Sequence, residues 1–387
     1  MGAEQLIEDR ERRARVAARL LRPAKSCTEI VDTLAGLHAT DPATVFLSVA
    51  ARLTDPDTAV ERLEEALYGE RPALARMLVM RRTMFVVTRD TASDVYAAAG
   101  RQIAAKERKK LLTHLAEGGG WDERWLADAE AEVEAALAAH GDLSGAELSR
   151  LVPRLREQVV VARGKPYETR QNVASRIIRT MAAEYRIARR RPAGSWTSSQ
   201  FRWAKAEPLP DRPVEEARAA VVRAWLRSYG PGTEADLKWW TGWTLTEVRK
   251  ALAAVGAEHV RLAGGTGHVL PGDTDGTPEA PPRAVLLPSL DPAPMGWQDR
   301  DWFLPRAHRA ALFDGTGNVG PTVWWGGEVI GGWAQRADGS VVWRRLTDRG
   351  TAAARAVDDA AAALSTWLGG VRITPRFRTP LERELTQ

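Results

Sequence analysis

The sequence predicts an α+β fold in which three tandem winged-helix modules are followed by a C-terminal β-barrel-like domain. The chain has 387 residues, more than one hydrophobic core usually organises. Helical segments followed by a strand pair recur along it, and strand-like segments dominate near its end. We therefore expect modules at 1–117, 118–210 and 211–277 and the β-rich domain at 278–387.

The first module is expected from three helices and a strand pair. Residues 26–29 have the spacing of a capping box, and Asp41 followed by proline matches an N-cap with proline at the first helical position. His38, Ala39 and Thr40 are left in the short junction between these two helices. In an extended junction His38 and Thr40 project to the same side, because side chains two residues apart share a face.

Arginine-bearing hairpins are expected in the first two modules. The runs LARMLVM and TMFVVT predict two strands joined by a basic tip, and YRIARRRPAGSWTSSQFRWA predicts a longer hairpin. Arginines beside aromatic rings near a turn are suited to gripping backbone phosphates. The alternative for both hairpins is a solvated cationic turn or edge. The candidate phosphate-binding residues are Arg81, Arg82, Arg186, Arg189, Arg190 and Arg191.

Further helix signals mark the second and third modules. A capping box at 144–147 and a helix from Gln171 to Ala183 are expected in the second module. In the third, boxes at 233–236 and 244–247 open two short helices, a helix-turn-helix candidate. The tryptophans between these boxes are expected in the core rather than stacked against bases, because their spacing lies inside the helix pair.

Two segments rich in turn-forming residues are expected to be linkers. These are the three glycines at 118–120 and the Pro, Gly and Asp-rich stretch at 271–283. The strand-like runs that follow, separated by Gly-Gly and Asp-Gly turns, predict the final β-rich domain. An alanine-rich helix from Thr351 to about Leu368 is expected to pack against it.

The composition excludes several classes of protein. Arginine supplies most of the 55 basic residues, and the formal net charge is +5. A GC-rich genome explains this excess as well as nucleic-acid binding does, so local clusters carry more information than the total. The single cysteine, Cys27, excludes an internal disulfide and the usual cysteine-based zinc sites. With neither a signal-like segment nor a run of about 18 apolar residues, we expect a cytoplasmic protein without a membrane span, metal or other cofactor.

Several segments together resemble the winged-helix DNA glycosylases typified by the azinomycin self-resistance enzyme and its relatives that unhook interstrand crosslinks. The resemblance covers nearly the whole chain, in the family's order. The segments that carry it are LAGLHATDPATVFLSVAARL, ARMLVMRRTMFVVT, YGPGTEADLKWWTG, LLPSLDPAPMGWQDRDWFLP and VRITPRFRTPLERE.

The resemblance implies an activity, a partner and a site. It implies hydrolysis of the N-glycosidic bond of bulky N7-alkylated purines by a monomer that binds double-stranded DNA carrying such adducts. The family's motif is Gln-apolar-Gln, or Gln-apolar-Asp in some members, at the junction occupied here by residues 38–40. His38 takes the first position and Thr40 the second, so neither catalytic residue type is kept.

These two residues suit the chemistry that such a bond requires. An N7-alkylated guanine already carries positive charge, so the remaining tasks are to stabilise an oxocarbenium-like sugar and to place a water. His38, with an unperturbed pKa of about 6.5, can accept a proton from that water, and Thr40 can orient it. On this basis excision is expected to slow below about pH 6.

Other interpretations of the same residues remain open. Asp41 is an alternative base, although its Asp-Pro context favours helix capping. No lysine adjoins the junction, which favours a hydrolase over a Schiff-base lyase. A non-catalytic winged-helix regulator would instead bind one DNA sequence tightly. A protein that sequesters a genotoxin would bind the free compound in a tryptophan-lined pocket.

Overall fold

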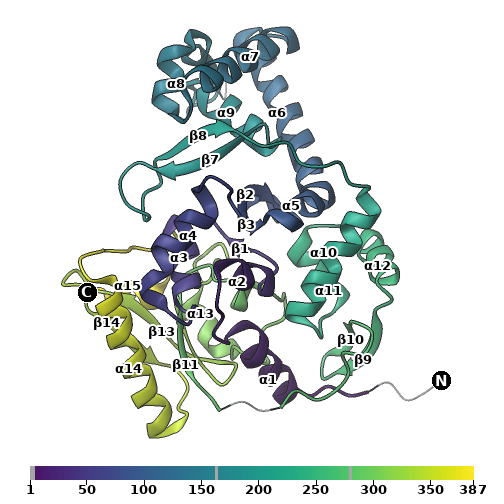
Figure 1. The fold of residues 1–387 in the computed structure, drawn as a ribbon, viewed down its shortest axis with the longest axis vertical. Helices are drawn as coiled ribbons and strands as arrows, with labels where there is room; N and C mark the ends of the chain where they lie inside the picture. Colours follow the sequence, from purple (N-terminus) through teal and green to yellow (C-terminus); the bar gives the residue numbers. More distant parts are fainter. Residues whose placement is uncertain (1–4, 162–163, 279–280) are drawn as a thin grey trace.

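The computed structural model describes residues 5–161, 164–278 and 281–387, which form a mixed α/β fold. Their strands form five antiparallel sheets of two to four strands each. Figure 1 shows a smaller lobe carrying helices α7, α8 and α9 above a larger body, joined to it by the long helix α6 and the β7–β8 hairpin. In the described chain, no helix combines the length and the apolar character that crossing a bilayer demands.

The N-terminal part of the body contains the polar junction. The prediction that Asp41 caps a helix is confirmed, because its carboxylate accepts the backbone N–H of Ala43. The box at 26–29 is half formed: Ser26 accepts the N–H of Glu29, whose carboxylate turns to the N–H of Lys25. The elements are α1 (Asp9–Leu20), α2 (Cys27–Thr33), β1 (Leu37–His38), α3 (Pro42–Ala50), η1 (Pro56–Thr58), α4 (Ala59–Tyr68), β2 (Leu74–Val79), η2 (Met80–Arg82), β3 (Thr83–Thr88), α5 (Arg89–Val95) and η3 (Tyr96–Gly100).

The smaller lobe follows the prediction with one missed hairpin. The box at 144–147 is confirmed, but the helix expected from Gln171 begins at Ala174, because 169–172 pairs with 158–161 as a hairpin. The three glycines at 118–120 do not form an open linker. Gly118 packs against Val159, and Gly120 caps the C-terminus of α6 in a left-handed conformation. The elements are α6 (Arg101–Gly119), α7 (Glu123–His140), β4 (Leu143–Ser144), α8 (Gly145–Leu151), η4 (Pro153–Arg156), β5 (Gln158–Val161), β6 (Thr169–Asn172), α9 (Ala174–Ala183), β7 (Ile187–Pro192) and β8 (Phe201–Lys205).

The chain then returns to the body through three helices and a hairpin. Both expected capping boxes, at Thr233 and Thr244, are confirmed, the first with Asp236 in place of the usual glutamate or glutamine. Trp240 and Trp243 are buried in the core as predicted, whereas Trp239 is only partly buried and packs against it. The elements are α10 (Val214–Tyr229), α11 (Glu234–Thr241), α12 (Leu245–Ala254), β9 (Glu258–Leu262) and β10 (Gly265–Val269).

The expected linker at 271–283 is fastened to the first helix over part of its length. Arg15 donates to the carbonyl oxygens of Asp273 and Asp275, and the Glu11 carboxylate accepts the N–H of Thr277. Residues 279 and 280 lie outside the described residues. This segment therefore serves as packing surface for α1 as well as a connection.

The C-terminal strands form an open sheet rather than a closed barrel. Within the described residues their order is β11–β12–β13–β14, so β11 and β14 are the edges. Helix α14 contacts both edge strands and α15 packs on β13, which explains how four strands are covered without closing. The elements are β11 (Ala284–Leu287), η5 (Ala293–Met295), η6 (Arg306–His308), α13 (Arg309–Leu312), β12 (Thr322–Trp325), β13 (Glu328–Gln335), β14 (Val341–Arg345), α14 (Gly350–Leu368) and α15 (Pro380–Leu385).

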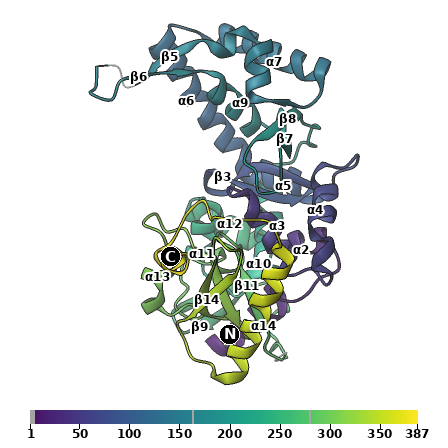
Figure 2. The same ribbon diagram turned by 90° about the vertical axis from the view of Figure 1, so that its left-hand side faces the viewer.

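Two large hydrophobic cores divide the molecule. One holds together side chains from 16–99, 185–255 and 285–385, so the N-terminal, third and C-terminal parts share a single core. The other contains side chains from 111–187 and belongs to the smaller lobe. The view in Figure 2 shows this lobe standing away from the body, with the β5–β6 hairpin projecting from it.

Candidate functional site

The polar junction lies at the edge of the first sheet. Strand β1 pairs with β3, with His38 opposite Phe85, and the N–H of Ala39 donates to the carbonyl oxygen of Met84 at 2.7 Å. The imidazole of His38 is only 6% exposed and packs against the Phe85 ring, with centroids 5.4 Å apart. Its Nδ1 is buried and has no hydrogen-bond partner in the described part of the chain.

This environment keeps His38 uncharged. Burial and then the nearby guanidinium of Arg81 lower the pKa of His38 to about 4. Burial and the neighbouring guanidinium both disfavour a positive charge on the imidazole. The imidazole is therefore neutral at physiological pH, and its basicity is close to that of an ordinary carboxylate.

The two residues that follow the histidine differ in their freedom. Thr40 is partly exposed, and its hydroxyl has no hydrogen-bond partner among the residues the structure describes. The carboxylate of Asp41 is engaged through both oxygens, which accept the N–H of Ala43 at 3.1 Å and of Arg376 at 2.9 Å. Thr40 is thus free to bind a ligand, whereas Asp41 holds α3 and the C-terminal segment in place.

The tip of the β2–β3 hairpin sends its two arginines in different directions. Both Arg81 and Arg82 have left-handed backbone conformations, with φ of 53° and 59°. The Arg81 guanidinium lies over the ring of Trp239 at 4.1 Å, and burial lowers its pKa to about 10. Arg82 is exposed and forms a two-pronged ion pair with Glu107.

The arginines of the second hairpin are mostly paired. Arg186 binds Glu130 and Glu134, and Arg191 lies 3.3 Å from a Glu64 oxygen. Arg190 donates to the carbonyl oxygen of Tyr68 at 3.0 Å and lies 3.6 Å from an Asp142 oxygen. These contacts partly neutralise three of the four candidate phosphate-binding arginines near this hairpin. Those of Arg190 and Arg191 also hold the hairpin against α4.

Arg189 differs from its neighbours because no carboxylate of the described residues forms an ion pair with it. Its guanidinium lies 4.6 Å from the Phe201 ring and 5.5 Å from the Trp203 ring, and its Nε is buried without a partner. Burial, followed by the charge of Arg76, lowers the pKa of Arg189 to about 10. Arg76, which lies within the apolar run LARMLVM, was not among the residues predicted to bind phosphate.

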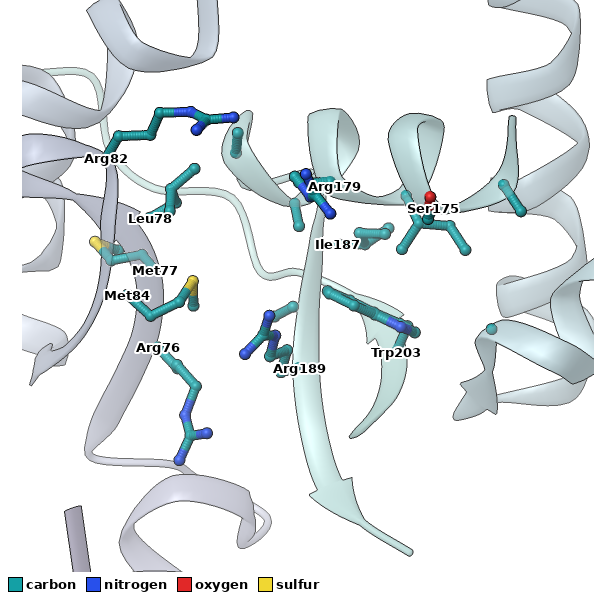
Figure 3. A pocket seen from close by; sticks show the side chains of 16 residues that line it. Arg76, Met77, Leu78, Arg82, Met84, Ser175, Arg179, Ile187, Arg189 and Trp203 are labelled. Carbon is teal, nitrogen blue, oxygen red and sulfur yellow. The ribbon is translucent and has the colours of Figure 1, made fainter. Parts of the chain in front are cut away.

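These two arginines belong to a basic pocket between the β2–β3 hairpin and the smaller lobe. Its volume is about 530 Å³, and none of the described residues that line it is acidic. Figure 3 shows side chains from β2 and β3 facing those from α9, β7 and β8 across it. The lining residues are Arg76, Met77, Leu78, Arg82, Met84, Gly145, Ala174, Ser175, Ile178, Arg179, Ala182, Ala183, Ile187, Ala188, Arg189 and Trp203.

The pocket and the junction lie on opposite faces of one strand. Met84 lines the pocket, whereas the adjacent Phe85 contacts His38. Neighbouring side chains in a strand point to opposite faces. The structure thus brings Arg82 and Arg189 to the pocket and Arg81 near His38, and it leaves Arg186, Arg190 and Arg191 outside both.

Metal ligation has no geometric support in the described residues. No group of three or more His, Cys, Asp or Glu side chains among them is arranged to hold a metal ion. The buried polar groups without partners near the two sites are nitrogens of Arg76, Arg81, Arg189 and His38 and the hydroxyl of Tyr68, and none of them is a carboxylate. Such groups suit an anionic or hydrogen-bonding ligand rather than a cation.

Arginines that lie against aromatic rings, as Arg81 and Arg189 do here, are a combination suited to binding the phosphates of nucleic acids. A family model described as DNA glycosylase AlkZ-like matches residues 31–367. The chain belongs to this AlkZ-like DNA glycosylase family.

A solved structure has the same fold. The chain resembles the Streptomyces sahachiroi DNA glycosylase AlkZ with a TM-score of 0.69, covering 96% of this chain and 99% of that chain at 21% identity. This likeness establishes a shared fold. Comparison with curated protein sequences gives no match.

Proposed function

We propose that the protein is a monofunctional DNA glycosylase that hydrolyses the N-glycosidic bond of bulky N7-alkylguanine adducts in duplex DNA. The observation that carries the proposal is the placement of His38, kept neutral by burial, at the first position of the family's motif beside the free hydroxyl of Thr40. Protection of the cell against a DNA-alkylating antibiotic is the proposed biological role.

The proposed architecture follows from the family. We propose winged-helix modules at 1–117, 118–210 and 211–277, a C-terminal β domain from 278, and a monomer that works in the cytoplasm. In this arrangement Arg81 and Arg189 supply positive charge to the DNA. Arg82, Arg186, Arg190 and Arg191 contribute less, because carboxylates already lie against them.

The chemistry needs a weak base that adds no positive charge. The departing base is already cationic, and the sugar becomes cationic as the bond breaks, so a protonated imidazole would repel the transition state. A histidine with a pKa of about 4 stays neutral and is about as basic as the carboxylate found in some members of the family. His38 accepts the water's proton, and Thr40 orients the water.

Asp41 is the weaker candidate for the base. Both of its oxygens already accept backbone N–H groups, from Ala43 and Arg376. We assign Asp41 to holding the motif in place.

The test is single-turnover excision from a duplex carrying a bulky N7-guanine adduct, with abasic sites revealed by alkaline cleavage. His38→Ala should slow excision by about 100-fold or more with little change in DNA affinity, and Thr40→Ala should slow it less. His38→Gln restores the family's residue type and should keep measurable excision. The exposed His140, far along α7, provides the control variant His140→Ala.

The pH profile gives an independent check. With the pKa of His38 at about 4, excision should stay nearly constant from pH 8 to about 5 and fall only near pH 4. This replaces the fall below about pH 6 that an unperturbed imidazole predicts. Excision by His38→Ala at the parental rate would falsify the assignment.

A further inference from the structure

Three buried arginines of this protein have contrasting environments. Arg15 and Arg52 are each 2% exposed, and both have carboxylate partners, Glu11 and Asp273 for the first and Asp291 for the second. Arg76 is equally enclosed at 5% exposure, yet all three of its guanidinium nitrogens are buried without a hydrogen-bond partner among the described residues.

The surroundings of Arg76 do not neutralise it. Its guanidinium lies 4.9 Å from the Phe201 ring, but Arg189 lies 4.6 Å from the same ring. The Phe201 ring attracts each guanidinium only modestly, and the positive charges of Arg76 and Arg189 repel each other. Leaving a buried charge unpaired is strongly unfavourable. The pocket therefore has an excess of positive charge that an anion would relieve.

The other residues that line the pocket indicate which kind of molecule carries the anionic group. Leu78, Met84, Ile178 and Ile187 give it apolar walls, and Trp203 provides a flat aromatic surface. Its volume of about 530 Å³ falls in the range of small-molecule sites. A guanidinium group can donate two parallel hydrogen bonds to the oxygens of one phosphate, and a tryptophan ring can stack on a nucleotide base.

The pocket is open at one edge. Exposed Ser175 and Arg179 from α9 and Arg82 from the hairpin tip line this edge. Arg179 has no ion-pair partner among the described residues, and Arg176 and Lys110 continue the basic surface beyond it, where Glu107 is an acidic residue paired with Arg82. A negatively charged ligand can therefore approach along a positively charged path.

We propose that this pocket binds a nucleotide unit, with its phosphate on the partly exposed Arg189, close to the buried charge of Arg76, and its base against Trp203. The nucleotide is either part of a DNA strand or free, and the recognition chemistry is the same. The DNA source rests on the proposed function; the pocket's preference for a nucleotide does not, because it involves neither His38 nor Thr40.

The experiment compares three probes on the full chain: inorganic phosphate, dGMP and a short 5′-phosphorylated single-stranded oligodeoxynucleotide. Calorimetric titration and thermal unfolding are measured for the parent, Arg76→Met, Arg189→Met and the control Arg355→Met, which removes an exposed arginine on α14. We expect dGMP to bind more tightly than inorganic phosphate and to raise the Tm of the parent and of Arg355→Met.

The two pocket variants should behave in an unusual way. Without ligand, Arg76→Met should unfold at the parental temperature or above it, because it removes an unpaired buried charge, whereas a purely structural arginine would give a lower temperature. Both variants should lose the shift caused by dGMP and bind dGMP about tenfold or more weakly. If Arg76→Met does not fold, Arg179→Met at the exposed edge should still weaken dGMP binding.

The outcomes distinguish a DNA strand from a free nucleotide as the ligand, and they test the nucleotide pocket separately from the proposed glycosylase activity. Weaker duplex binding by Arg189→Met, in step with weaker dGMP binding, assigns the site to a DNA strand; parental duplex affinity assigns it to a free nucleotide. Parental dGMP affinity in both pocket variants, no dGMP binding by the parent, or binding of phosphate as tight as that of dGMP overturns the inference. Loss of excision in His38→Ala with dGMP binding intact shows that the two proposals stand separately.

Discussion

The contact between α3 and the loop after β11 and the basic pocket beside β2 both bury an arginine, but in opposite ways. In the first, Arg52 meets Asp291 through two hydrogen bonds of 2.7 and 2.8 Å, and Ser48 donates to the same carboxylate. In the second, no carboxylate meets Arg76. Both arginines are buried, so burial alone does not distinguish them. We infer that a carboxylate partner marks an arginine that stabilises the fold, and that the lack of one marks an arginine suited to binding an anion.

The difference is a matter of free energy. A buried ion pair adds little net stability, but removing one member leaves the other charge buried and alone. Removing an arginine that is already alone leaves no such charge behind. The same substitution is therefore expected to have different effects at Arg52 and Arg76.

The largest effect is expected at the paired site. Arg52→Met should lower the free energy of unfolding by about 3–5 kcal/mol, because Asp291 is left fully buried without its partner. Urea unfolding of Arg52→Met and Arg76→Met measures the contrast. Adding Asp291→Leu to Arg52→Met should recover part of the loss. Equal losses at Arg52 and Arg76 would contradict the comparison.

A somewhat smaller effect is expected from His38, a second unpartnered group. Its pKa is about 4 when folded and about 6.5 when unfolded, so below pH 6.5 the unfolded chain binds more protons. Stability should therefore fall as pH decreases from 6.5 to 4, by about 3 kcal/mol in total. Urea unfolding across this range should show a shallower pH slope for His38→Gln than for the parent. Identical slopes would mean that His38 titrates normally.

The smallest effect is expected at Asp41, whose hydrogen bonds are complete. Asp41→Asn keeps one acceptor oxygen but turns an amide towards the second backbone N–H, so stability should fall by about 1 kcal/mol. Thermal unfolding measures this loss, and single-turnover excision should remain close to the parental rate. Abolished excision in a folded Asp41→Asn protein would place the base at Asp41 instead of His38.

Much of the local structure could be predicted because it depends on neighbouring residues. Capping at Ser144, Thr233 and Thr244 needs only a hydroxyl and a carboxylate three residues apart, and all three boxes form. The β2–β3 and β7–β8 hairpins and the final long helix also follow from local patterns. The β5–β6 hairpin was missed because its second strand, Thr169–Asn172, is polar and fully exposed.

The site was less predictable because its properties come from distant contacts. His38 was identified by its position in the motif, but its low pKa depends on burial and on Arg81. Arg76 was overlooked in an apolar strand, although an arginine that shares a face with Leu74 and Leu78 is a signal in itself. The ring beside it, Phe201, belongs to the distant strand β8, and no local pattern reveals that contact.

The two cores give the molecule a mechanical property. Ala97 to Ala99, in the π-helical turn η3, are anchored in the core of the body, whereas Leu111 and Leu115 of α6 are anchored in the core of the lobe. With 19 residues, α6 is about 28 Å long, so it would act as a lever arm if the lobe turned relative to the body. A 10° change of angle at its base would move its far end by about 5 Å. Because the nucleotide pocket is lined from both sides of this lever, its width is tied to the angle at which the lobe stands.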